Sequence, residues 1–357
     1  MTSYDVVVVG GGVVGASTAA ALSESGLSTA AVHAGHQLPS ATEASGGLVR
    51  AYDSDSETRR LALQSYEMLW GQPGDRRNRC GFQETGSVVC LSQQELVDLS
   101  AVLADLARHG IATEILTASD VSRRWPVLGG AGIEAALWEP GGGYAAPPAT
   151  ATTLLQEARD RGVVEVSNCR VRRLLRSRER VVGVETDLGQ ILARAVVVAA
   201  GCGSAALLPP EIAGELLTKR IRYALVAHPA RPLPTLVDSV TGMWGRPYDE
   251  GRLLVGRPDA DWNVQPASGR HITEQQWEYI RAGGATRWPE LAGAALVGAR
   301  TGTDLYRRRG PLLGAVSSCP GLVVATAWSG GGFKTAPAAG RTAAKAAMAI
   351  VAGRPSC

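Results

Sequence analysis

The pattern of apolar positions at the start of the chain predicts a strand, a turn, a helix and a second strand. Residues 6–9 are four consecutive valines, and a glycine-rich segment follows at 10–15. An Ala-rich stretch at 16–25 ends at Gly26, and residues 28–32 form another short apolar run. A continuous β-branched run bounded by glycine is typical of a strand buried on both faces, as in parallel sheets. The pattern therefore predicts a compact βαβ unit over residues 5–32.

Beyond this unit, helical and strand-like patterns alternate. Apolar residues at helical spacing or Ala-rich composition predict helices over 57–70, 94–109, 149–161 and about 337–351. Short apolar runs predict strands over 86–91, 163–175, 181–186, 195–200 and 322–326. Short strands separated by Pro and Gly turns over 220–254 are typical of an antiparallel sheet. The Gly/Pro-rich stretch 140–148 is interpreted as a linker or domain crossing.

Composition narrows the class of protein. The chain has 357 residues, of which 45% are hydrophobic and 19% charged, so we expect a globular protein, with two domains as the starting assumption. The net charge of +3 argues against a nucleic-acid partner. No apolar stretch is long enough to span a membrane and no basic signal-peptide start is present, so we expect a cytoplasmic protein without membrane contact. The cysteines and histidines show no metal-ligand spacing, so no metal site is expected.

The glycine-rich turn carries the first candidate chemistry. Gly10, Gly12 and Gly15 form G-x-G-x-x-G between a predicted strand and helix. In a dinucleotide site these glycines allow the tight turn, the approach of the backbone to a pyrophosphate, and close helix packing. The alternative is a glycine-rich turn without a nucleotide. One rule is broken, because His33 stands where the second strand usually ends in an acidic ligand for the ribose hydroxyls.

At this point the sequence resembles the FAD-dependent amino-acid and amine oxidases, a family that includes glycine oxidase, monomeric sarcosine oxidase and D-amino-acid oxidase. The resemblance covers nearly the whole chain in order. It rests on the fingerprint at 10–15, Ala-Ser-Gly-Gly-Leu at 44–48, the segments 183–186 and 196–201, Gly-Arg-Leu-Leu-Val-Gly at 251–256, Arg-Thr-Gly-Thr at 300–303, and Gly-Phe-Lys at 332–334 with Pro337. The family implies FAD as the cofactor, which the fingerprint alone leaves open.

The resemblance also implies a set of FAD contacts. They are Gly10, Gly12, Val13, Val14 and Gly15 at the pyrophosphate, His33 near the ribose, Val171 near the adenine, Ala200 and Gly201 near the ribityl chain, Ser45, Gly46, Gly47 and Leu48 against the isoalloxazine, and Gly330, Gly331, Gly332, Phe333 and Lys334 near the flavin O2 atom. Arg300 stands where sarcosine oxidase carries the cysteine linked to FAD, so non-covalent FAD is implied.

At the substrate end, the family implies that Arg300 binds a carboxylate, as in glycine oxidase-like enzymes. Lys334 and Arg50 match the carboxylate-binding pair of sarcosine oxidase, although a lysine at a helix entrance and a surface arginine are simpler interpretations. Trp244 matches a position where relatives often have an active-site tyrosine. Leu254 occupies the position of the lysine linked to oxygen activation in sarcosine oxidase. The three arginines at 307–309 either attract a second carboxylate or form a solvated loop.

These implications define the expected protein. We expect an α/β fold with a Rossmann-like FAD-binding domain formed by residues 1–82, 144–217 and 301–357, and a mixed, mainly antiparallel substrate domain formed by 83–143 and 218–300. The expected reaction is oxidation of glycine or an N-substituted glycine, for example an N-carboxymethyl amino acid in biosynthesis, by O2 with release of glyoxylate, an amine and H2O2. Alternatives are a dehydrogenase with another electron acceptor, a D-amino-acid oxidase, an inactive flavin-binding regulator and a nicotinamide-dependent dehydrogenase. The substituent, stereochemistry and oligomeric state stay open.

Overall fold

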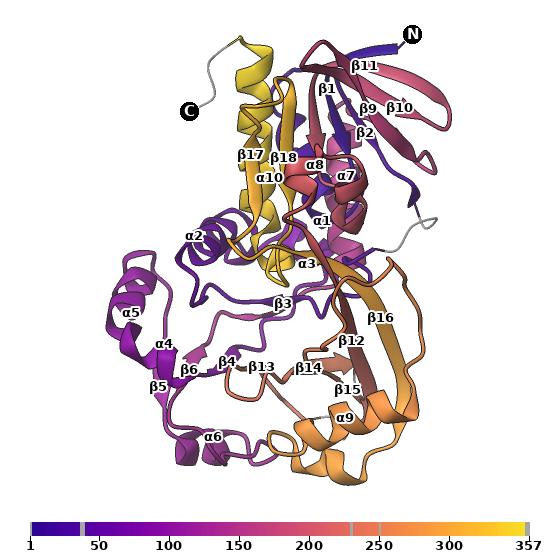
Figure 1. The fold of residues 1–357 in the computed structure, drawn as a ribbon. Coiled ribbons are helices and arrows are strands. Elements are labelled where there is room, and N and C mark those ends of the chain that lie inside the picture. The colour runs from indigo at the N-terminus through magenta and orange to yellow at the C-terminus, as the bar shows by residue number, and fades with distance from the viewer. Residues whose placement is uncertain (1, 36–39, 229–230, 250, 354–357) are drawn as a thin grey trace.

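The computed structural model describes residues 2–35, 40–228, 231–249 and 251–353 and shows two lobes, each built on an eight-stranded sheet (Figure 1). The first sheet contains β1 (Thr2–Val9), β2 (Thr29–Val32), β8 (Val164–Val166), β9 (Val171–Ser177), β10 (Arg180–Thr186), β11 (Gly189–Val198), β17 (Leu312–Ala315) and β18 (Leu322–Thr326). The second contains β4 (Ser87–Cys90), β5 (Glu114–Leu116), β6 (Ala136–Glu139), β12 (Leu217–Ala227), β13 (Thr235–Asp238), β14 (Trp244–Asp249), β15 (Arg252–Gly256) and β16 (Leu296–Tyr306). The short strands β3 (Leu48–Val49) and β7 (Gly143–Tyr144) pair with each other.

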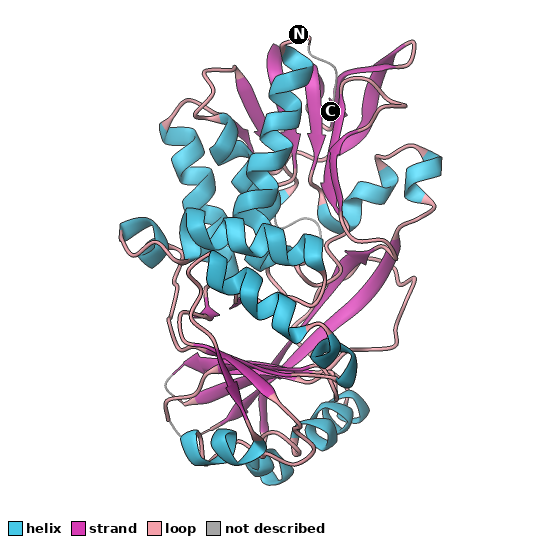
Figure 2. Ribbon diagram, turned by 90° about the vertical axis from the view of Figure 1, so that its left-hand side faces the viewer, coloured by secondary structure: helices cyan, strands magenta, loops and turns pink. Residues whose placement is uncertain are grey.

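The helices lie around these sheets (Figure 2). The α-helices are α1 (Val13–Leu22), α2 (Ser56–Ser65), α3 (Asp75–Arg79), α4 (Gln93–Val97), α5 (Leu99–Arg108), α6 (Ala118–Arg124), α7 (Pro147–Asp160), α8 (Pro210–Ala213), α9 (Glu274–Gly284) and α10 (Gly332–Val351). A π-helix, η2 (Tyr66–Trp70), and two 3-10 helices, η3 (Gly201–Ala206) and η4 (Pro289–Gly293), complete the described elements. None of the described helices is long and apolar enough to cross a membrane.

The first lobe is a Rossmann-like layer. β1 lies between β11 and β2 and is parallel to both, and β18 and β8 extend the parallel arrangement on either side. The four valines of β1 are buried because both faces of the strand are covered. Helices α1 and α10 cover one face, and residues of β9 and β10 pack on the other. The βαβ unit predicted from the sequence is therefore observed.

The second lobe is a mixed and mainly antiparallel sheet. Its strand order is β16-β12-β15-β14-β13-β4-β6-β5, with one parallel pair between β13 and β4. One face packs on α6, α9 and η4 through a core that includes Trp277, Trp288 and Leu291. Together the two layers confirm the predicted fold class.

Three of the expected domain boundaries lie within strands rather than in loops. The boundary 143/144 lies in β7, 217/218 lies at the start of β12, and 300/301 lies in β16.

Several elements differ from the sequence prediction. The stretch 163–175 contains two strands, because the chain turns between β8 and β9, where Asn168 has a left-handed φ of 53°. The helix predicted for 94–109 is interrupted at Asp98, and the 57–70 helix ends in the π-helix η2. The segment interpreted as a linker holds β7 and the start of α7.

The last helix also begins earlier than predicted. α10 starts at Gly332, so Pro337 lies inside the helix. A proline there removes one backbone hydrogen bond and normally destabilises a helix. The apolar face that carries Ala336, Ala339 and Ala343 is fully buried against the first lobe, and this packing outweighs the local cost. As a consequence, the helix N-terminus lies at Gly331 and Gly332, next to the cavity.

Candidate active site

A large cavity of about 800 Å³ runs from the β1–α1 turn to the second sheet. It is lined by the 9–14 turn, the 40–50 loop, the start of β9, the start of β12, Trp244 on β14 and the 328–334 segment before and within α10. Of the site residues predicted from the sequence, all except Gly15 and Arg300 line it. The fold therefore brings together residues from widely separated parts of the chain.

The glycine fingerprint has the geometry of a dinucleotide cradle. Gly10 has φ +124°, and a Cβ at this position would lie 2.2 Å from the carbonyl oxygen of Ala199. A Cβ on Gly15 would lie 2.0 Å from the carbonyl oxygen of Gly10, so glycine here allows α1 to pack on the strand. A Cβ on Gly12 would meet only the Thr42 hydroxyl, so this residue faces the open cavity.

The N-terminus of α1 supplies the electrostatic part of the cradle. Gly12 caps the helix without a side-chain hydrogen bond, and its first turn contains no acidic side chain. The N–H of Val13 donates to the Thr42 hydroxyl at 3.1 Å, but the next N–H groups of the first turn and the positive end of the helix dipole still favour a bound anion. The backbone conformation, the open space over Gly12 and this field together fit a pyrophosphate group.

His33 lies at the adenosine end of the cavity, after β2. Its imidazole packs over Gly11, since a Cβ on Gly11 would lie 2.6 Å from His33 Cγ. The Nε2 atom lies 2.8 Å from Oε1 of Glu165, which lies on β8 and also lines the cavity. Val171, at the start of β9, lines the same end of the cavity.

Trp244 connects the 45–48 loop with the second sheet. Its indole fills the space that a side chain on Gly46 or Gly256 would need, because a Cβ on either glycine would lie within 2.3 Å of an indole carbon. Its ring also meets Tyr223 edge to face, with the ring centroids 6.1 Å apart. The indole of Trp244 therefore forms part of the cavity wall and fits closely against two glycines.

A cluster of buried charged residues also borders the cavity. The ammonium group of Lys334, which is 3% exposed, donates to Oδ2 of Asp53 at 2.6 Å and to the carbonyl oxygen of Tyr52 at 2.9 Å. Arg50 lines the cavity beside this pair, and its Nε is buried without a hydrogen-bond partner among the described residues. Glu139 is buried behind them and accepts hydrogen bonds from the backbone of Ala51 and Tyr52.

Burial and mutual charge shift the titration of this cluster. Burial and the neighbouring Arg50 charge lower the pKa of Lys334 to about 8, although Asp53 opposes the shift. Burial works against ionisation of Asp53, but the Lys334 and Arg50 charges hold its pKa below the usual value. Burial raises the pKa of Glu139. The cluster therefore carries cations that a ligand carboxylate can approach from the cavity.

Arg300 lies outside the cavity lining. It is on β16 opposite Tyr223 of β12, which in turn pairs with Gly256, the neighbour of Trp244. Directly opposed residues of antiparallel strands point to the same sheet face. Arg300 thus shares a sheet face with Trp244, and Tyr223 lies between them in the strand order. Nη1 of Arg300 donates to the carbonyl oxygen of Ala299. The contact of this guanidinium with the substrate and FAD, which the resemblance implies, therefore stays a prediction.

The segment before α10 is strained and is held by a half-buried carboxylate. Ala327, Ser329 and Gly330 have left-handed φ values of 61°, 50° and 87°. Such backbone is costly for residues other than glycine and is characteristic of ligand-binding segments. Asp304 accepts a hydrogen bond from the backbone N–H of Gly330 at 3.1 Å and from that of Leu305 at 2.8 Å. Burial raises the pKa of Asp304 to about 6.

Several cavity residues were missed by sequence reasoning: Asp53, Glu165, Lys219 and Asp304. Lys219 lies with its ammonium 4.5 Å from the ring centroid of Trp262 and 5.3 Å from that of Tyr306. None of these residues belongs to a local motif, so no signal in the sequence distinguishes them from surface charges. Arg246, just behind the cavity, was also missed, and it donates from Nε to the carbonyl oxygen of Gly46 at 2.5 Å.

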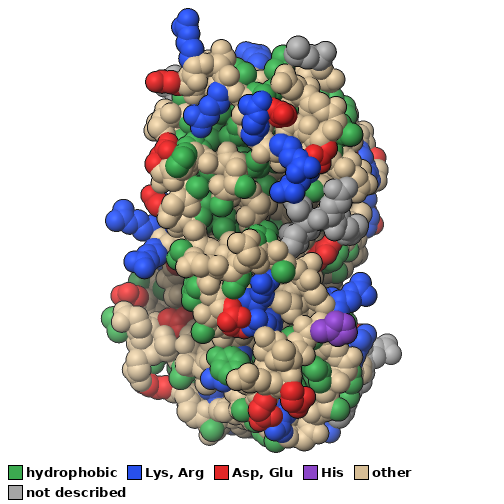
Figure 3. Space-filling view, turned by 45° about the vertical axis from the view of Figure 1, so that its right-hand side comes forward, with side chains coloured by type: hydrophobic (Ala, Val, Ile, Leu, Met, Phe, Trp, Pro, Cys, Tyr) green, Lys and Arg blue, Asp and Glu red, His purple; other side chains and the backbone are tan. Residues whose placement is uncertain are grey.

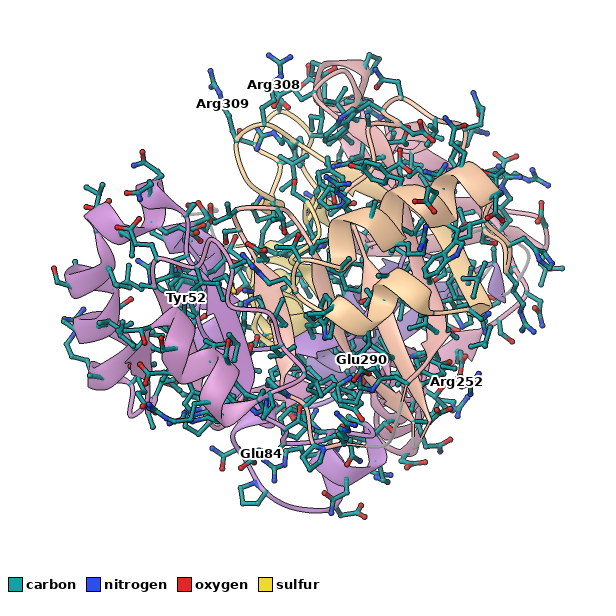
Figure 4. All side chains as sticks on the ribbon, turned by 90° about the horizontal axis from the view of Figure 1, so that it is seen from below. Tyr52, Glu84, Arg252, Glu290, Arg308 and Arg309 are labelled. Carbon is teal, nitrogen blue, oxygen red and sulfur yellow. The ribbon has the colours of Figure 1, made fainter. Side chains whose placement is uncertain are left out.

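The arginines at 307–309 do not enter the cavity lining. Arg307 pairs with Glu215 at 2.6 Å. Figure 4 shows Arg308 and Arg309 projecting away from the body of the protein. The solvated-loop interpretation therefore describes Arg308 and Arg309. On the face drawn in Figure 3, basic, acidic and apolar side chains are interspersed.

Among the described residues, no group of three or more His, Cys, Asp or Glu side chains has the arrangement of a metal site. The described cysteines are buried and form no disulfide with one another: Cys80, Cys90, Cys169, Cys202 and Cys319. The cavity combines a nucleotide cradle with an aromatic and cationic pocket, an arrangement that fits a dinucleotide-dependent oxidoreductase with a small-molecule substrate.

Comparisons with known proteins specify this class. Residues 5–346 match the family of FAD dependent oxidoreductases, and the chain belongs to that family. The chain is 28% identical to 4-methylaminobutanoate oxidase (formaldehyde-forming) of Paenarthrobacter nicotinovorans over 96% of its length, but it spans only 43% of that enzyme. It is also 28% identical to glycine oxidase of Pseudomonas aeruginosa, with 95% of this chain and 93% of that enzyme covered.

The fold agrees with a solved structure of the same kind. The crystal structure of glycine oxidase from Geobacillus kaustophilus superposes with a TM-score of 0.80 at 23% sequence identity, covering 99% of this chain and 96% of that one. The predicted family resemblance, the glycine oxidase-like fold and the FAD cofactor are thereby confirmed. The protein is an FAD-dependent oxidoreductase that acts on amino-acid or amine donors.

Proposed function

We propose that this protein oxidises glycine or an N-substituted glycine at the carbon next to the carboxylate. The observation that carries the proposal is that Arg50, Lys334 and Trp244 line the same cavity as the glycine turn that fits a dinucleotide. A substrate that is anionic at one end and has an amine close to that end suits such a pocket.

We assign the substrate carboxylate to Arg50 and Lys334. Arg50 lines the cavity with an unpartnered Nε, and a guanidinium can offer two parallel N–H donors to a carboxylate. The ammonium of Lys334 has three hydrogens, of which two are used by Asp53 and Tyr52, so one donor is left. Arg300 does not line the cavity and receives no role in this assignment.

The chain positions the reacting atoms rather than supplying a base. Anchoring the carboxylate fixes the α carbon, and the Trp244 wall limits how the N-substituent can lie, which together lower the entropic part of the barrier. FAD, when bound, would supply the hydride acceptor for that carbon. The amine lone pair forms the C=N bond of an imine as the hydride leaves, so a substrate with a neutral amine needs no side-chain base.

The reaction balances with water and O2. The two electrons and two hydrogens removed from R–NH–CH2–COO⁻ reduce O2 to H2O2, and water converts the imine to glyoxylate and R–NH2. We further propose that residues 1–82, 144–217 and 301–357 serve the cofactor, and that 83–143 and 218–300 close the substrate side, in keeping with the two sheets that meet at the cavity.

The test is an assay of O2 uptake, H2O2 and glyoxylate with glycine, sarcosine and N-carboxymethyl amino acids. Each substrate is matched with the amine that lacks its carboxylate. We expect equal amounts of glyoxylate and H2O2 from a carboxylate-bearing substrate and no turnover of its matched amine. Equal turnover of the matched amine would contradict the carboxylate assignment, and substrate oxidation without O2 uptake would replace O2 by another acceptor.

A further inference from the structure

The adenosine end of the cavity lacks the acidic residue that usually follows the second strand of a dinucleotide-binding unit. His33 occupies that position, and its imidazole covers Gly11 of the fingerprint. The ribose of a bound cofactor has two hydroxyl groups that need acceptors once they leave water. The question is which group of this chain accepts from them.

Both ring nitrogens of His33 are already used. The backbone N–H of Gly35 lies 3.2 Å from Nδ1 and can only donate, so Nδ1 is the unprotonated nitrogen. The proton of the neutral ring is then on Nε2, which donates to Oε1 of Glu165 at 2.8 Å. This tautomer follows from the hydrogen-bond network. His33 therefore has no ring nitrogen left to accept a hydrogen bond from a hydroxyl.

Glu165 has the acceptor capacity that His33 lacks. It lies on β8, where it is directly opposite Ala31 of β2, and its side chain lines the cavity with 14% exposure. A carboxylate can accept about four hydrogen bonds. One of them comes from His33 and another from Arg159, which pairs with Oε2. Acceptor sites on both oxygens remain available toward the cavity.

The surroundings of Glu165 keep it ionised. Burial opposes ionisation, but the His33 hydrogen bond and the Arg159 charge hold the pKa of this carboxyl below its usual value. An ionised carboxylate is a stronger acceptor for a hydroxyl than a neutral imidazole. The hydrogen bonds of His33 with Gly35 and Glu165 fix the orientation of the imidazole ring. The fixed ring in turn holds the Glu165 side chain at the end of β2.

We propose that Glu165 is the acceptor for the adenosine ribose hydroxyls of FAD, and that His33 is a positioning residue that transfers this role from β2 to the neighbouring strand β8. The inference concerns the cofactor only and does not depend on which amine the enzyme oxidises. It assigns the function of the missing acidic residue to a position more than a hundred residues further along the chain.

The test measures FAD binding by the protein after removal of its flavin, using isothermal titration calorimetry. We expect Glu165→Gln to raise the Kd for FAD about 10-fold or more, because a charge-assisted hydrogen bond to the ribose is lost. Binding of FMN, which has no adenosine, is expected to change less than twofold. Glu185→Gln is the matched control, since Glu185 also lies on the first sheet and pairs with an arginine, Arg173, but does not line the cavity.

A rescue variant separates this role from a structural one. In the double variant His33→Glu with Glu165→Gln, the carboxylate returns to the end of β2, and we expect affinity for FAD to recover to within about threefold of the unmodified protein. A second measurement uses the unmodified protein alone, which should bind an FAD analogue with a 2′,3′-dideoxyadenosine group at least about 10-fold more weakly than FAD.

Two outcomes overturn the proposal. One is an unchanged Kd for FAD in the Glu165→Gln variant, and the other is equal affinity of the unmodified protein for FAD and the dideoxy analogue. If Glu165→Gln does not fold, the comparison of FAD with the analogue in the unmodified protein still decides whether the ribose hydroxyls are recognised. Glu165→Asp then decides whether the carboxylate recognises them, because a shortened acceptor should reduce the preference for FAD over the analogue.

Discussion

Replacing Arg50 with glutamine is expected to weaken binding of the substrate carboxylate and leave the cofactor bound. Arg50 and Lys334 are the cations at this end of the cavity that our assignment uses, and the nearest carboxylate, Asp53, already pairs with Lys334. In Arg50→Gln, the remaining Lys334–Asp53 pair has no net charge and the buried Glu139 adds no positive charge, so the pocket loses its attraction for an anion. Gln also retains one N–H donor group, which limits the change to charge and to the planar fork of donors.

The magnitude follows from the charge that is removed. Two unit charges about 4 Å apart interact by about 4 kcal/mol at the effective dielectric constant typical of protein sites. Truncating one partner of a buried charge pair costs about 2–5 kcal/mol in measured complexes. We therefore expect a loss of about 2–4 kcal/mol, which corresponds to a roughly 30- to 900-fold increase in the Kd of a carboxylate ligand.

The assay compares three variants under the same conditions. The Kd of an unreactive carboxylate ligand is measured from changes in the visible flavin spectrum, and KM and kcat are measured with the substrate. Arg300→Gln tests the alternative anchor implied by the family resemblance, and we expect a change of less than about threefold because Tyr223 separates Arg300 from Trp244. Arg308→Gln is the control for removing a positive charge at the surface (Figure 4).

The reasoning would be refuted if Arg300→Gln weakened the carboxylate ligand as much as Arg50→Gln. It would also be refuted if Arg50→Gln raised the Kd by less than about threefold with the flavin still bound. An unchanged flavin spectrum without ligand in all three variants confirms that the comparison reports on the substrate pocket and not on loss of FAD.

Four further outcomes are expected. Gly10→Ala should abolish FAD binding, seen as a colourless purified protein, because its Cβ would lie 2.2 Å from the carbonyl oxygen of Ala199; a yellow variant would contradict this account of the turn. The affinity for a carboxylate ligand should fall as the pH rises through about 8, where Lys334 loses its charge, and Lys334→Met should lack this step. Because the pKa of Lys334 is lower in the folded than in the unfolded protein, the unfolded chain binds more protons between pH 8 and 10.5, so the free energy of unfolding should rise over this range relative to Lys334→Met. Finally, Arg287→Met should reduce the free energy of unfolding by about 3–5 kcal/mol in chemical denaturation, because it leaves Asp238, which is 0% exposed, without its partner at 2.7 Å; Arg308→Met should change it by less than about 0.5 kcal/mol.

The parts of the site that follow local rules could be predicted from the sequence. The fingerprint glycines act within one short βαβ unit, so their spacing alone determines the contacts of Gly10 and Gly15. The 44–48 and 332–334 motifs pointed to two further segments that line the cavity. These segments contain Lys334 and Gly46, which packs against Trp244.

The parts that depend on long-range packing could not be predicted. Lys334 and Asp53 are 281 positions apart, and no pattern in either segment indicates that they pair. The environment of Arg300 depends on the register of β12 and β16, which places Tyr223 directly opposite it. The sequence showed that His33 breaks a rule, but the compensating Glu165 lies on a strand whose neighbour is known only from the sheet order.

The start of α10 illustrates the same limit at the level of secondary structure. Pro337 favours the first turn of a helix, so local preference placed the helix start there. The structure begins the helix at Gly332, because the buried Ala-rich face of the helix contributes more than one lost hydrogen bond costs. This shift brings the helix N-terminus to the cavity, where its partial positive charge can act on a bound ligand.

The most direct test of the central claim is an anaerobic titration of the flavin-loaded protein, followed by its visible spectrum. The titrants are glycine, sarcosine, D-alanine, N-alkyl glycines and N-carboxymethyl amino acids, each beside its matched amine without a carboxylate. We predict that at least one glycine or N-substituted glycine bleaches the long-wavelength flavin band and that its matched amine does not. Bleaching by the amines alone, or by none of the carboxylate-bearing compounds, would contradict the proposed substrate class.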